Sequence, residues 1–578
     1  MKKIMHLCKD PFAQALIFLS AILTSILYKK PDYLISTYDA KFHVFRLMSS
    51  IGALNDGQIV PQFDPYRVRG FGNAANLFYG PLTSWLMVPI YFLTRNTFIS
   101  IIILMFIITL VTSIVIYTVG LRIFKSRNIS FIVAIVYMLE PYHLSQMTMR
   151  MNPGEYLTFT FIPLIFLSFY EIVYESKISI RQLLLLSLGV SGLILNHILT
   201  TVIIGALFLF IAIFECKKIA SKKVIILVVQ ALILAVGVSA VYIFPFIEVK
   251  NLNIYSIFWD QFKMSNPAIM SRISPSSLFL TRTNFPLRIT WMLWAVVFIY
   301  ILIRKEIKNK KVKDFSFILI FLSIMIPLLG TNLSILNFFE KYIKVLQFTD
   351  RLILIPAVSL PIVMGLIITM NKKMVDKNFF IILAFILAFY GWTITLTTQD
   401  RILGEPYNVN RDFNEQNITS PIAMGEYLPR MIANEGNISI EKGIESSVRN
   451  IENRGDDLRI IQGNIIIKNY SKNGSKINLD VEKTDGDTII EFPIIYYPGF
   501  KANLESQKVK TTFSKNGFLQ VELKKNQIGN LKIKYGLSKL SFIGLIISII
   551  SVVVITILFF YSIMSKSQNK GNKTAVSY

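Results

Sequence analysis

The segment from Tyr38 to Arg46 places three side chains that can do chemistry at helical spacing. Asp39 and His43 are four residues apart, and Arg46 follows three residues later. Residues three and four apart share one face of a helix. The spacing therefore predicts that a carboxylate, an imidazole and a guanidinium lie together. A carboxylate within hydrogen-bond reach of a hydroxyl can act as its general base.

The same segment also allows a purely structural interpretation. Ser36-x-x-Asp39 fits the capping-box spacing, in which an acidic side chain satisfies backbone N–H groups at the start of a helix. Taken alone, this pattern favours a helix cap over catalysis. Further polar residues at the ends of later apolar runs reverse that preference.

Three later clusters place ionisable side chains at the ends of apolar runs. Burying one such side chain in the hydrocarbon of a bilayer costs ~2.5–3.5 kcal/mol or more, so their presence needs a reason. The clusters are Glu140-Pro141-Tyr142-His143 with Arg150 to Glu155, Asn196-His197, and Gln347-Phe348-Thr349-Asp350-Arg351. Arg351 is explained by snorkelling, by a local pair with Asp350, or by binding an anionic lipid headgroup through its guanidinium fork. Arg150 and Glu155 form either a buried charge pair or an active-site pair.

Three of the four histidines, His43, His143 and His197, belong to these clusters. With Asp39, Glu140 and Glu155 they offer the ligand types of a metal site. The sequence has no HxxxH or HExxH spacing, so we predict no transition-metal site. No cofactor is identified, although a weakly held divalent cation is compatible with the carboxylates.

The composition is that of a polytopic membrane protein rather than a soluble one. Of 578 residues, 53% are hydrophobic and 16% are charged, and the run from Phe98 to Val119 is uncharged and long enough to span a bilayer. The net charge of +25 comes from lysines and arginines in short segments between apolar runs. This distribution is typical of the positive-inside rule and not of a nucleic-acid-binding domain.

Apolar length and loop charge together predict about twelve transmembrane helices with both termini cytoplasmic. The runs lie near residues 11–28, 97–120, 129–145, 156–173, 182–196, 198–214, 224–247, 289–303, 315–329, 350–370, 378–396 and 540–562. The run from Leu82 to Leu93 contains Pro89, and we expect it to be a helix lying in the outer interface, within a first outer loop of residues 29–96.

Residues 397–539 predict an extracytoplasmic domain between the membrane part, 1–396, and a final span, 540–562, with a cytoplasmic tail at 563–578. Alternating residues from about 445 onward indicate strands. The expected strands are Leu458 to Lys468, Lys476 to Glu482, Thr488 to Ile495, Val509 to Phe513, Phe518 to Leu523 and Leu531 to Tyr535. Asn-Gly and Asp-Gly pairs between them are hairpin signals, and the whole predicts a small β-sandwich.

Several short motifs resemble a bacterial membrane family labelled pyruvoyl-tetrahydropterin-synthase-related, which is akin to the YfhO-like proteins. They are Asp39-x-x-x-His43-x-x-Arg46, Gly57-x-x-x-Pro61, Gly70-Phe71-Gly72, Tyr79-Gly80-Pro81-Leu82, Arg150 to Glu155, Asn196-His197, Leu346 to Arg351 and Tyr496 to Ala502. Together they cover nearly the whole chain. These families are similar in layout to GT-C glycosyltransferases, which use a polyprenyl-phosphate-linked sugar and an acidic residue in the first outer loop.

The resemblance implies that Asp39 is the acid of the first loop and Glu155, or less readily Glu140, is a second acid. His43 would orient Asp39 or tune its pKa. Substrate would be bound by a set of polar residues consisting of Arg46, Arg150, His197, Asp350 and Arg351. One departure concerns the first loop, where many GT-C enzymes have paired acids and this chain has no second acid before Asp56.

The function that we expect is glycosyl transfer at the extracytoplasmic face of the bacterial cytoplasmic membrane. The partners would be a polyprenyl-phosphate-linked sugar donor, a glycan or cell-envelope polymer as acceptor, and the lipid bilayer, without nucleic acid. Two alternatives stay open: a transporter or flippase of lipid-linked glycans, and a non-catalytic cell-envelope assembly protein. A transporter predicts charged or broken helices at mid-membrane.

Overall fold

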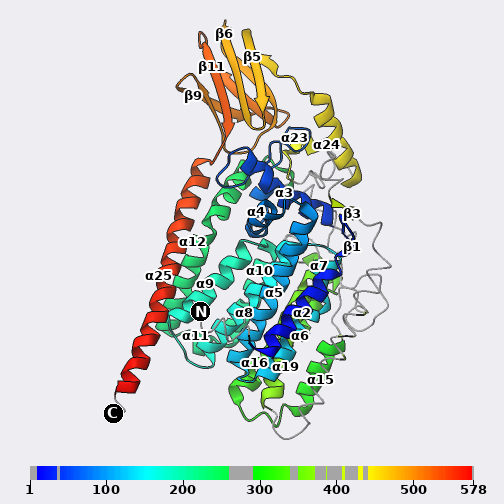
Figure 1. The fold of residues 1–578 in the computed structure, drawn as a ribbon, viewed down its shortest axis with the longest axis vertical. Coiled ribbons are helices and arrows are strands. Elements are labelled where there is room, and N and C mark those ends of the chain that lie inside the picture. The colour runs from blue at the N-terminus through cyan, green and yellow to red at the C-terminus, as the bar shows by residue number, and fades with distance from the viewer. Residues whose placement is uncertain are drawn as a thin grey trace.

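Apolar helices form a bundle that carries a β-domain at one end in the computed structural model (Figure 1). The structure describes residues 9–34, 39–258, 291–338, 349–370, 407–409, 427–433 and 440–575, and single residues at 386, 389 and 393. Helix α2 begins, and helix α25 ends, at the end of the bundle opposite the β-domain. Both ends of the described chain therefore lie on the same side of the bundle.

The helices of the bundle, with the short helices beside them, have the following bounds. They are α2 (Pro11–Ser25), α3 (Ala40–Asn55), η1 (Ala75–Leu77), α4 (Leu82–Thr94), α5 (Thr97–Ile123), α6 (Arg127–Leu139), α7 (Pro141–Thr148), α8 (Pro153–Val173), α9 (Ile180–Ile194), α10 (Ile198–Phe214), α11 (Cys216–Ile219), α12 (Lys222–Leu252), η2 (Ser256–Phe258), α15 (Trp291–Ile303), α16 (Lys310–Leu329), α17 (Leu333–Phe338), η5 (Thr349–Ile353), α19 (Leu354–Met370), α23 (Arg430–Ala433), α24 (Ile440–Arg454) and α25 (Lys539–Ala575).

Within the described residues, six helical segments are long and apolar enough to cross a membrane. They are Thr97–Ile123, Pro153–Val173, Lys222–Leu252, Lys310–Leu329, Thr349–Met370 and Lys539–Ser565, and six shorter apolar helices accompany them. Most of the predicted spans therefore coincide with apolar helices, although the count of about twelve stays a prediction. The predicted span at 378–396 lies almost wholly outside the described residues.

Two predicted helices, at 129–145 and over Leu82 to Leu93, can be compared directly with the structure. The predicted span at 129–145 is wrong in its second half, because α6 ends at Leu139 and α7 begins at Pro141. Glu140 separates them with an extended backbone, and its carboxylate accepts a hydrogen bond from His143 N at 3.1 Å to cap α7. The helix expected over Leu82 to Leu93 is present as α4. Its interfacial position stays a prediction.

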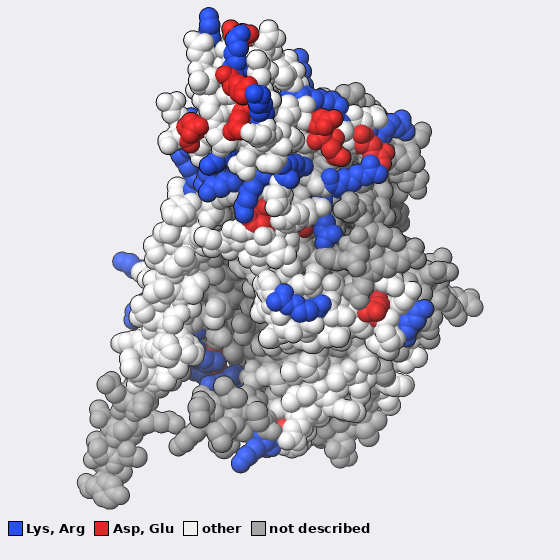
Figure 2. All heavy atoms as spheres, turned by 45° about the horizontal axis from the view of Figure 1, so that its top comes forward, with Lys and Arg blue, Asp and Glu red and all other residues white. Residues whose placement is uncertain are grey.

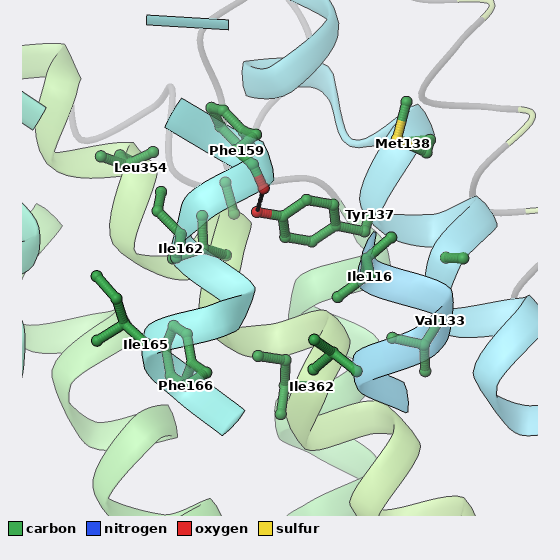
Figure 3. Close-up of a cluster of buried hydrophobic side chains, with 14 of the residues drawn as sticks. Ile116, Val133, Tyr137, Met138, Phe159, Ile162, Ile165, Phe166, Leu354 and Ile362 are labelled. Carbon is green, nitrogen blue, oxygen red and sulfur yellow. Dashed lines mark hydrogen bonds between the residues drawn. The ribbon is translucent and has the colours of Figure 1, made fainter. Parts of the chain in front are cut away.

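The interior of the bundle is made by α5, α6, α8 and α19. Figure 3 shows apolar side chains from these helices in contact, including Ile116, Val133, Ile162 and Ile362. Each of these four is buried, and the Tyr137 hydroxyl completes the set by donating to the Phe159 carbonyl at 2.9 Å. Helix α25 differs, since 17% of its most apolar window is buried and it packs along α12 on the flank of the bundle.

Eight antiparallel strands form the β-domain. They are β4 (Arg459–Gln462), β5 (Ile465–Asn473), β6 (Lys476–Thr484), β7 (Thr488–Ile495), β8 (Phe500–Leu504), β9 (Gln507–Phe513), β10 (Phe518–Leu523) and β11 (Gly529–Tyr535), in the spatial order β4-β7-β10-β9-β8-β11-β6-β5. The predicted β-domain is confirmed, but not its division into the two sheets of a sandwich, because the strands are joined in one continuous sheet whose two halves share one buried core. The strands begin after α24, later than the expected start near 445.

Two strand boundaries also differ from expectation, and glycine explains one of them. The strand expected over Leu458 to Lys468 is divided at Gly463, where φ is 82° and an added Cβ would lie 2.6 Å from Thr488 Oγ1. Strand β8 was not expected. Its polar residues alternate with buried Phe500, Ala502 and Leu504, in a stretch that follows the Tyr496–Gly499 turn.

The β-domain is joined to the first loop by polar contacts and aromatic packing. Asp56 Oδ1 accepts from Ser475 N at 3.0 Å, and Lys472 Nζ donates to the Gly70 and Pro493 carbonyls, each at 2.8 Å. The Phe63 ring packs among aromatic rings of the sheet, with Tyr535 at 4.9 Å between centroids. These contacts fix the loop that leads from α3 to α4.

Candidate active site

Asp39 precedes the first turn of α3 at the end of the bundle that meets the β-domain. It occupies the N-cap position, but its side chain makes no capping hydrogen bond. Asp39 therefore does not cap α3 through its side chain, and the other residue of the predicted capping box, Ser36, lies outside the described residues. Burial raises the pKa of Asp39, whereas the charges of Arg150 and Arg351 lower it and that of Glu155 raises it further. Asp39 thus lies within electrostatic range of all three residues.

Glu155 is held in the first turn of α8 with 1% of its surface exposed. Its backbone N–H donates to Asn152 Oδ1, the helix cap, at 3.1 Å. The Tyr142 hydroxyl donates to Glu155 Oε1 at 2.6 Å, and His197 Nε2 lies 3.8 Å from Oε2. Two side chains from other elements, α7 and the start of α10, therefore orient this carboxylate.

His197 caps α10, and its contacts define its tautomer. Nδ1 accepts from Thr200 N at 3.3 Å, so this nitrogen carries no proton and the proton of the neutral ring is on Nε2, toward Glu155. Burial lowers the pKa of His197 to about 4, although the charge of Glu155 opposes that shift. The ring is therefore neutral at pH 7.

Arg150 forms its ion pair with a residue two hundred positions away. Its Nη2 lies 2.9 Å from Asp350 Oδ2, and both side chains are largely buried. The local alternatives, Asp350 with Arg351 and Arg150 with Glu155, are thus replaced by a pair that links the α7–α8 loop to η5. Burial alone would lower the pKa of Arg150, but Asp350 and Glu155 raise it above its usual value. Arg150 therefore stays charged, and buried Arg351 stands beside this pair in sequence.

Arg46 is fully buried, and protein groups occupy most of its donors. Its guanidinium donates to the Gly80 carbonyl at 3.0 Å, to Ser84 Oγ at 3.1 Å and to Thr83 Oγ1 at 3.0 Å. A role for Arg46 in substrate binding stays a prediction. Its contacts indicate that it positions α4 against α3.

Tyr79 and Tyr142 are site residues that the sequence analysis did not single out. The Arg46 guanidinium lies 4.6 Å from the Tyr79 ring centroid, and the rings of His43 and His197 lie at 5.5 and 5.7 Å. Asn152 Nδ2 donates to the Tyr79 hydroxyl at 3.1 Å. The signal was the Tyr79-Gly80 pair: a Cβ on Gly80 would lie 2.5 Å from the Leu195 carbonyl, so only glycine permits this close approach.

His43 shares the face of α3 with Arg46, as the spacing predicts, because both side chains contact Tyr79. What joins His43 to Asp39 is a backbone hydrogen bond, from His43 N to Asp39 O at 3.0 Å. Burial lowers the pKa of His43 well below its usual range, with the nearby charge of Arg46 acting in the same direction. Its expected influence on Asp39 stays a prediction.

Glu140 and His143 belong to the structural part of this region. The His143 ring stacks on Phe159 and Tyr156, with centroids 4.2 and 4.6 Å away. Burial lowers the pKa of His143 to about 3 and raises the pKa of Glu140 to about 8. Glu140 caps α7, which makes Glu155 the better candidate for the second acid.

Between pH 6.5 and 8, we expect the unfolding free energy of wild type to fall with rising pH because of Glu140. In Glu140→Gln this part of the decrease should be absent. Native Glu140 keeps its proton up to about pH 8, whereas the unfolded chain releases it near 4.5, so this group's contribution is lost as the pH rises through 8. Wild type should lose about 1–2 kcal/mol of unfolding free energy over this interval relative to the variant. Thermal denaturation in detergent at several pH values measures the difference. Parallel pH profiles for the two proteins would contradict the assignment.

No cluster of three or more His, Cys, Asp or Glu side chains suited to a metal ion occurs in the part of the chain that the structure describes. The acidic side chains of the site instead face arginines, a tyrosine and a neutral histidine. This set of groups can accept a proton at Asp39 and hold an anion beside Arg150 and Arg351.

Comparison with known proteins finds a relative of similar length but no matching family model. No family model matches the chain. An uncharacterized protein of Lactococcus lactis subsp. cremoris (strain MG1363) is 25% identical over 562 residues, which cover 90% of each chain. The resemblance to the pyruvoyl-tetrahydropterin-synthase-related family stays a prediction.

Two solved enzyme structures align with more than half of the chain. Arabinofuranosyltransferase AftD from Mycobacteria has a TM-score of 0.41 and 12% identity, over 69% of this chain and 27% of that one. Arabinosyltransferase EmbB from Mycobacterium smegmatis has a TM-score of 0.32 and 10% identity, over 92% and 63%. The chain thus spans less than two thirds of either enzyme. Neither TM-score is high enough to assign a fold, so function has to be inferred from the site.

Proposed function

We propose that this protein is a membrane glycosyltransferase of GT-C type. It would move a sugar from a polyprenyl-phosphate-linked donor to a hydroxyl of an extracytoplasmic glycan or cell-envelope polymer. The observation that supports this most is the grouping of Asp39, Glu155, Arg150 and Arg351. These residues come from three distant segments and meet at one end of an apolar bundle.

In the proposed reaction, Asp39 is the general base. An acceptor hydroxyl oxygen attacks the anomeric carbon, its proton passes to the Asp39 carboxylate, and the bond from that carbon to the phosphate oxygen breaks. The half-buried position of Asp39 supports this role, since burial raises the pKa of its carboxyl, and with it the affinity for a proton, while the charges of Arg150 and Arg351 act in the opposite direction.

The leaving group would be polyprenyl phosphate, an anion attached to a long hydrocarbon chain. Arg150 and Arg351 supply fixed positive charge, and the guanidinium fork matches phosphate oxygens. Asp350 holds Arg150 in place at 2.9 Å. A site at the end of the bundle also lets the isoprenoid chain stay in hydrocarbon while its phosphate meets the arginines.

Glu155 would act as the second acid, oriented by Tyr142 and His197. Its burial and the hydrogen bond from the Tyr142 hydroxyl fix the carboxylate at one position. A carboxylate held in this way can orient a substrate hydroxyl or balance the charge of the arginines. Either use requires the carboxylate to stay ionised.

The decisive experiment gives purified full-length protein a polyprenyl-phosphate sugar together with a glycan acceptor. Release of free polyprenyl phosphate, and labelling of the acceptor, would support transfer. If labelled donor crosses a liposome membrane intact without sugar release, the protein is a transporter. If neither occurs and the chain binds an envelope polymer, an assembly role is the better description.

Tyr142→Phe is expected to lower kcat/KM for transfer by about 10- to 100-fold, because the hydrogen bond it removes goes to a charged group. Tyr137→Phe is the matched control. It removes the hydroxyl of another buried tyrosine in the same region, which donates to the Phe159 carbonyl instead of to a carboxylate. Equal losses in the two variants would contradict the role given to Tyr142.

A further inference from the structure

Two lysines face each other on the exposed side of the β-sheet. Strands β8 and β11 pair so that Lys501 lies directly opposite Lys534, and both side chains are exposed. Like charges at directly opposed positions repel each other and weaken a sheet. Replacing one of the two lysines with an uncharged residue would therefore be expected to stabilise the sheet.

Several other lysines of the β-domain form ion pairs with a carboxylate. Lys468 pairs with Glu482, Lys510 with Glu522 and Lys524 with Asp487, at 2.7, 2.9 and 2.9 Å. Within the described β-domain, neither Lys501 nor Lys534 has a carboxylate within ion-pair distance. Their charge is therefore available to an external anion.

The charge on this face changes sign along the strands. One step beyond the lysine pair, Lys532 lies opposite Asn503 on β8 and opposite Asn478 on β6. A further step on, Asn530 lies opposite Asp480 and its N–H donates to Glu505 Oε1. Along β11 and the residues paired with it, the two opposed lysines thus lie near one end of the strands, and Asp480 and Glu505 lie toward the other.

The basic end is the end that meets the membrane helices. Strand β11 ends at Tyr535, and α25 begins four residues later at exposed Lys539. Ser538 Oγ donates to Glu248 on α12, whose last turn carries exposed Lys250. Figure 2 shows blue side chains gathered in a band where the β-domain meets the helices.

We propose that Lys501 and Lys534, together with Lys539 five residues further along the chain, form a surface that binds the headgroups of anionic phospholipids in the leaflet next to the β-domain. Helix α25 begins at Lys539 and its most apolar window is 17% buried, so a bilayer around this helix would bring headgroups to the level of Lys539 and of the strand ends next to it. Lysines near a membrane surface attract anionic lipid over about one Debye length, ~8–10 Å. The bound lipid would fix the orientation of the β-domain relative to the helix bundle. This proposal does not depend on which reaction the protein catalyses.

The test uses full-length protein in a neutral detergent, titrated with short-chain phosphatidylglycerol or phosphatidylcholine while thermal unfolding is followed. Wild type should be stabilised by phosphatidylglycerol and not by phosphatidylcholine. Lys501→Gln/Lys534→Gln should bind phosphatidylglycerol about 5- to 30-fold more weakly. Lys483→Gln/Lys525→Gln, which changes two exposed lysines at the opposite end of the strands, should bind like wild type.

Folding and the nature of the anion are checked in the same assay. Without lipid, the Lys501→Gln/Lys534→Gln protein should unfold at the same temperature as wild type or higher, because the change relieves repulsion. Binding of phosphatidylglycerol by this variant as tight as wild type would overturn the proposal. So would a wild-type response to a soluble glycerol-phosphate polymer or to inorganic phosphate that matches or exceeds the response to phosphatidylglycerol.

Discussion

Asp39→Asn is expected to lower the rate of sugar transfer by about 10²- to 10⁴-fold, the range in which a positioned general base contributes. The amide keeps the size and shape of the side chain but cannot take a proton from the acceptor hydroxyl. Binding of the donor should change little, since Arg150 and Arg351 remain. The loss should therefore fall on kcat, and release of polyprenyl phosphate measures it.

A control and a pH profile make this prediction sharp. Asp32→Asn changes another aspartate of the same first segment, in the turn between β1 (Tyr28–Lys30) and β2 (Tyr33–Leu34), and should keep wild-type activity. Burial raises the pKa of Asp39, so this carboxyl becomes protonated at a higher pH than an ordinary aspartate. As the pH is lowered, wild-type activity should therefore begin to fall at a pH above the usual pKa range of an aspartate. Full activity in Asp39→Asn would show that this carboxyl takes no part in proton transfer.

Arg46→Lys is expected to cost about 2–4 kcal/mol of unfolding free energy, the largest stability effect among the changes considered. Lysine keeps the charge but not the planar fork, so it cannot reach the Gly80 carbonyl, Thr83 and Ser84 together. Each buried acceptor left without its donor costs about 1–3 kcal/mol. Thermal unfolding in detergent measures the loss.

The matched control for Arg46 is Arg95→Lys. Arg95 is an exposed arginine at the C-terminal end of α4, and its replacement should change stability by no more than ~0.5 kcal/mol. A small effect of Arg46→Lys, equal to that of the control, would mean that the buried hydrogen bonds are not limiting. A loss of donor affinity without loss of stability would instead support direct substrate binding by Arg46.

The local features of the site were predictable because they depend on spacing within one helix. Asp39, His43 and Arg46 are three and four residues apart, and the shared contact of His43 and Arg46 with Tyr79 follows from that periodicity. The capping alternative for Asp39 could not be rejected from sequence. What the sequence could not show is that the Asp39 side chain makes no capping hydrogen bond and that charges from distant Arg150 and Arg351 act on it.

Long-range pairing is what the sequence could not specify. The sequence offered Glu155 as the acidic partner of Arg150 and Arg351 as the partner of Asp350, and neither local pairing identified the ion pair between Arg150 and Asp350. The β-domain shows the same limit: alternation predicted most of its strands, but not that they join in one sheet of order β4-β7-β10-β9-β8-β11-β6-β5. Strand order depends on which edges meet, and hydrophobic alternation is identical for a sandwich and a single sheet.

The contacts of Asp56 with Ser475, and of Gly70 with Lys472, have a consequence for biosynthesis. Some four hundred residues separate these partners, so the ribosome makes the α3–α4 connection long before the strands that fix it exist. The end of the bundle that carries the candidate site can reach its final structure only after the late portion of the chain has been made. A protein truncated before β5 should insert its early helices yet leave that connection exposed to protease.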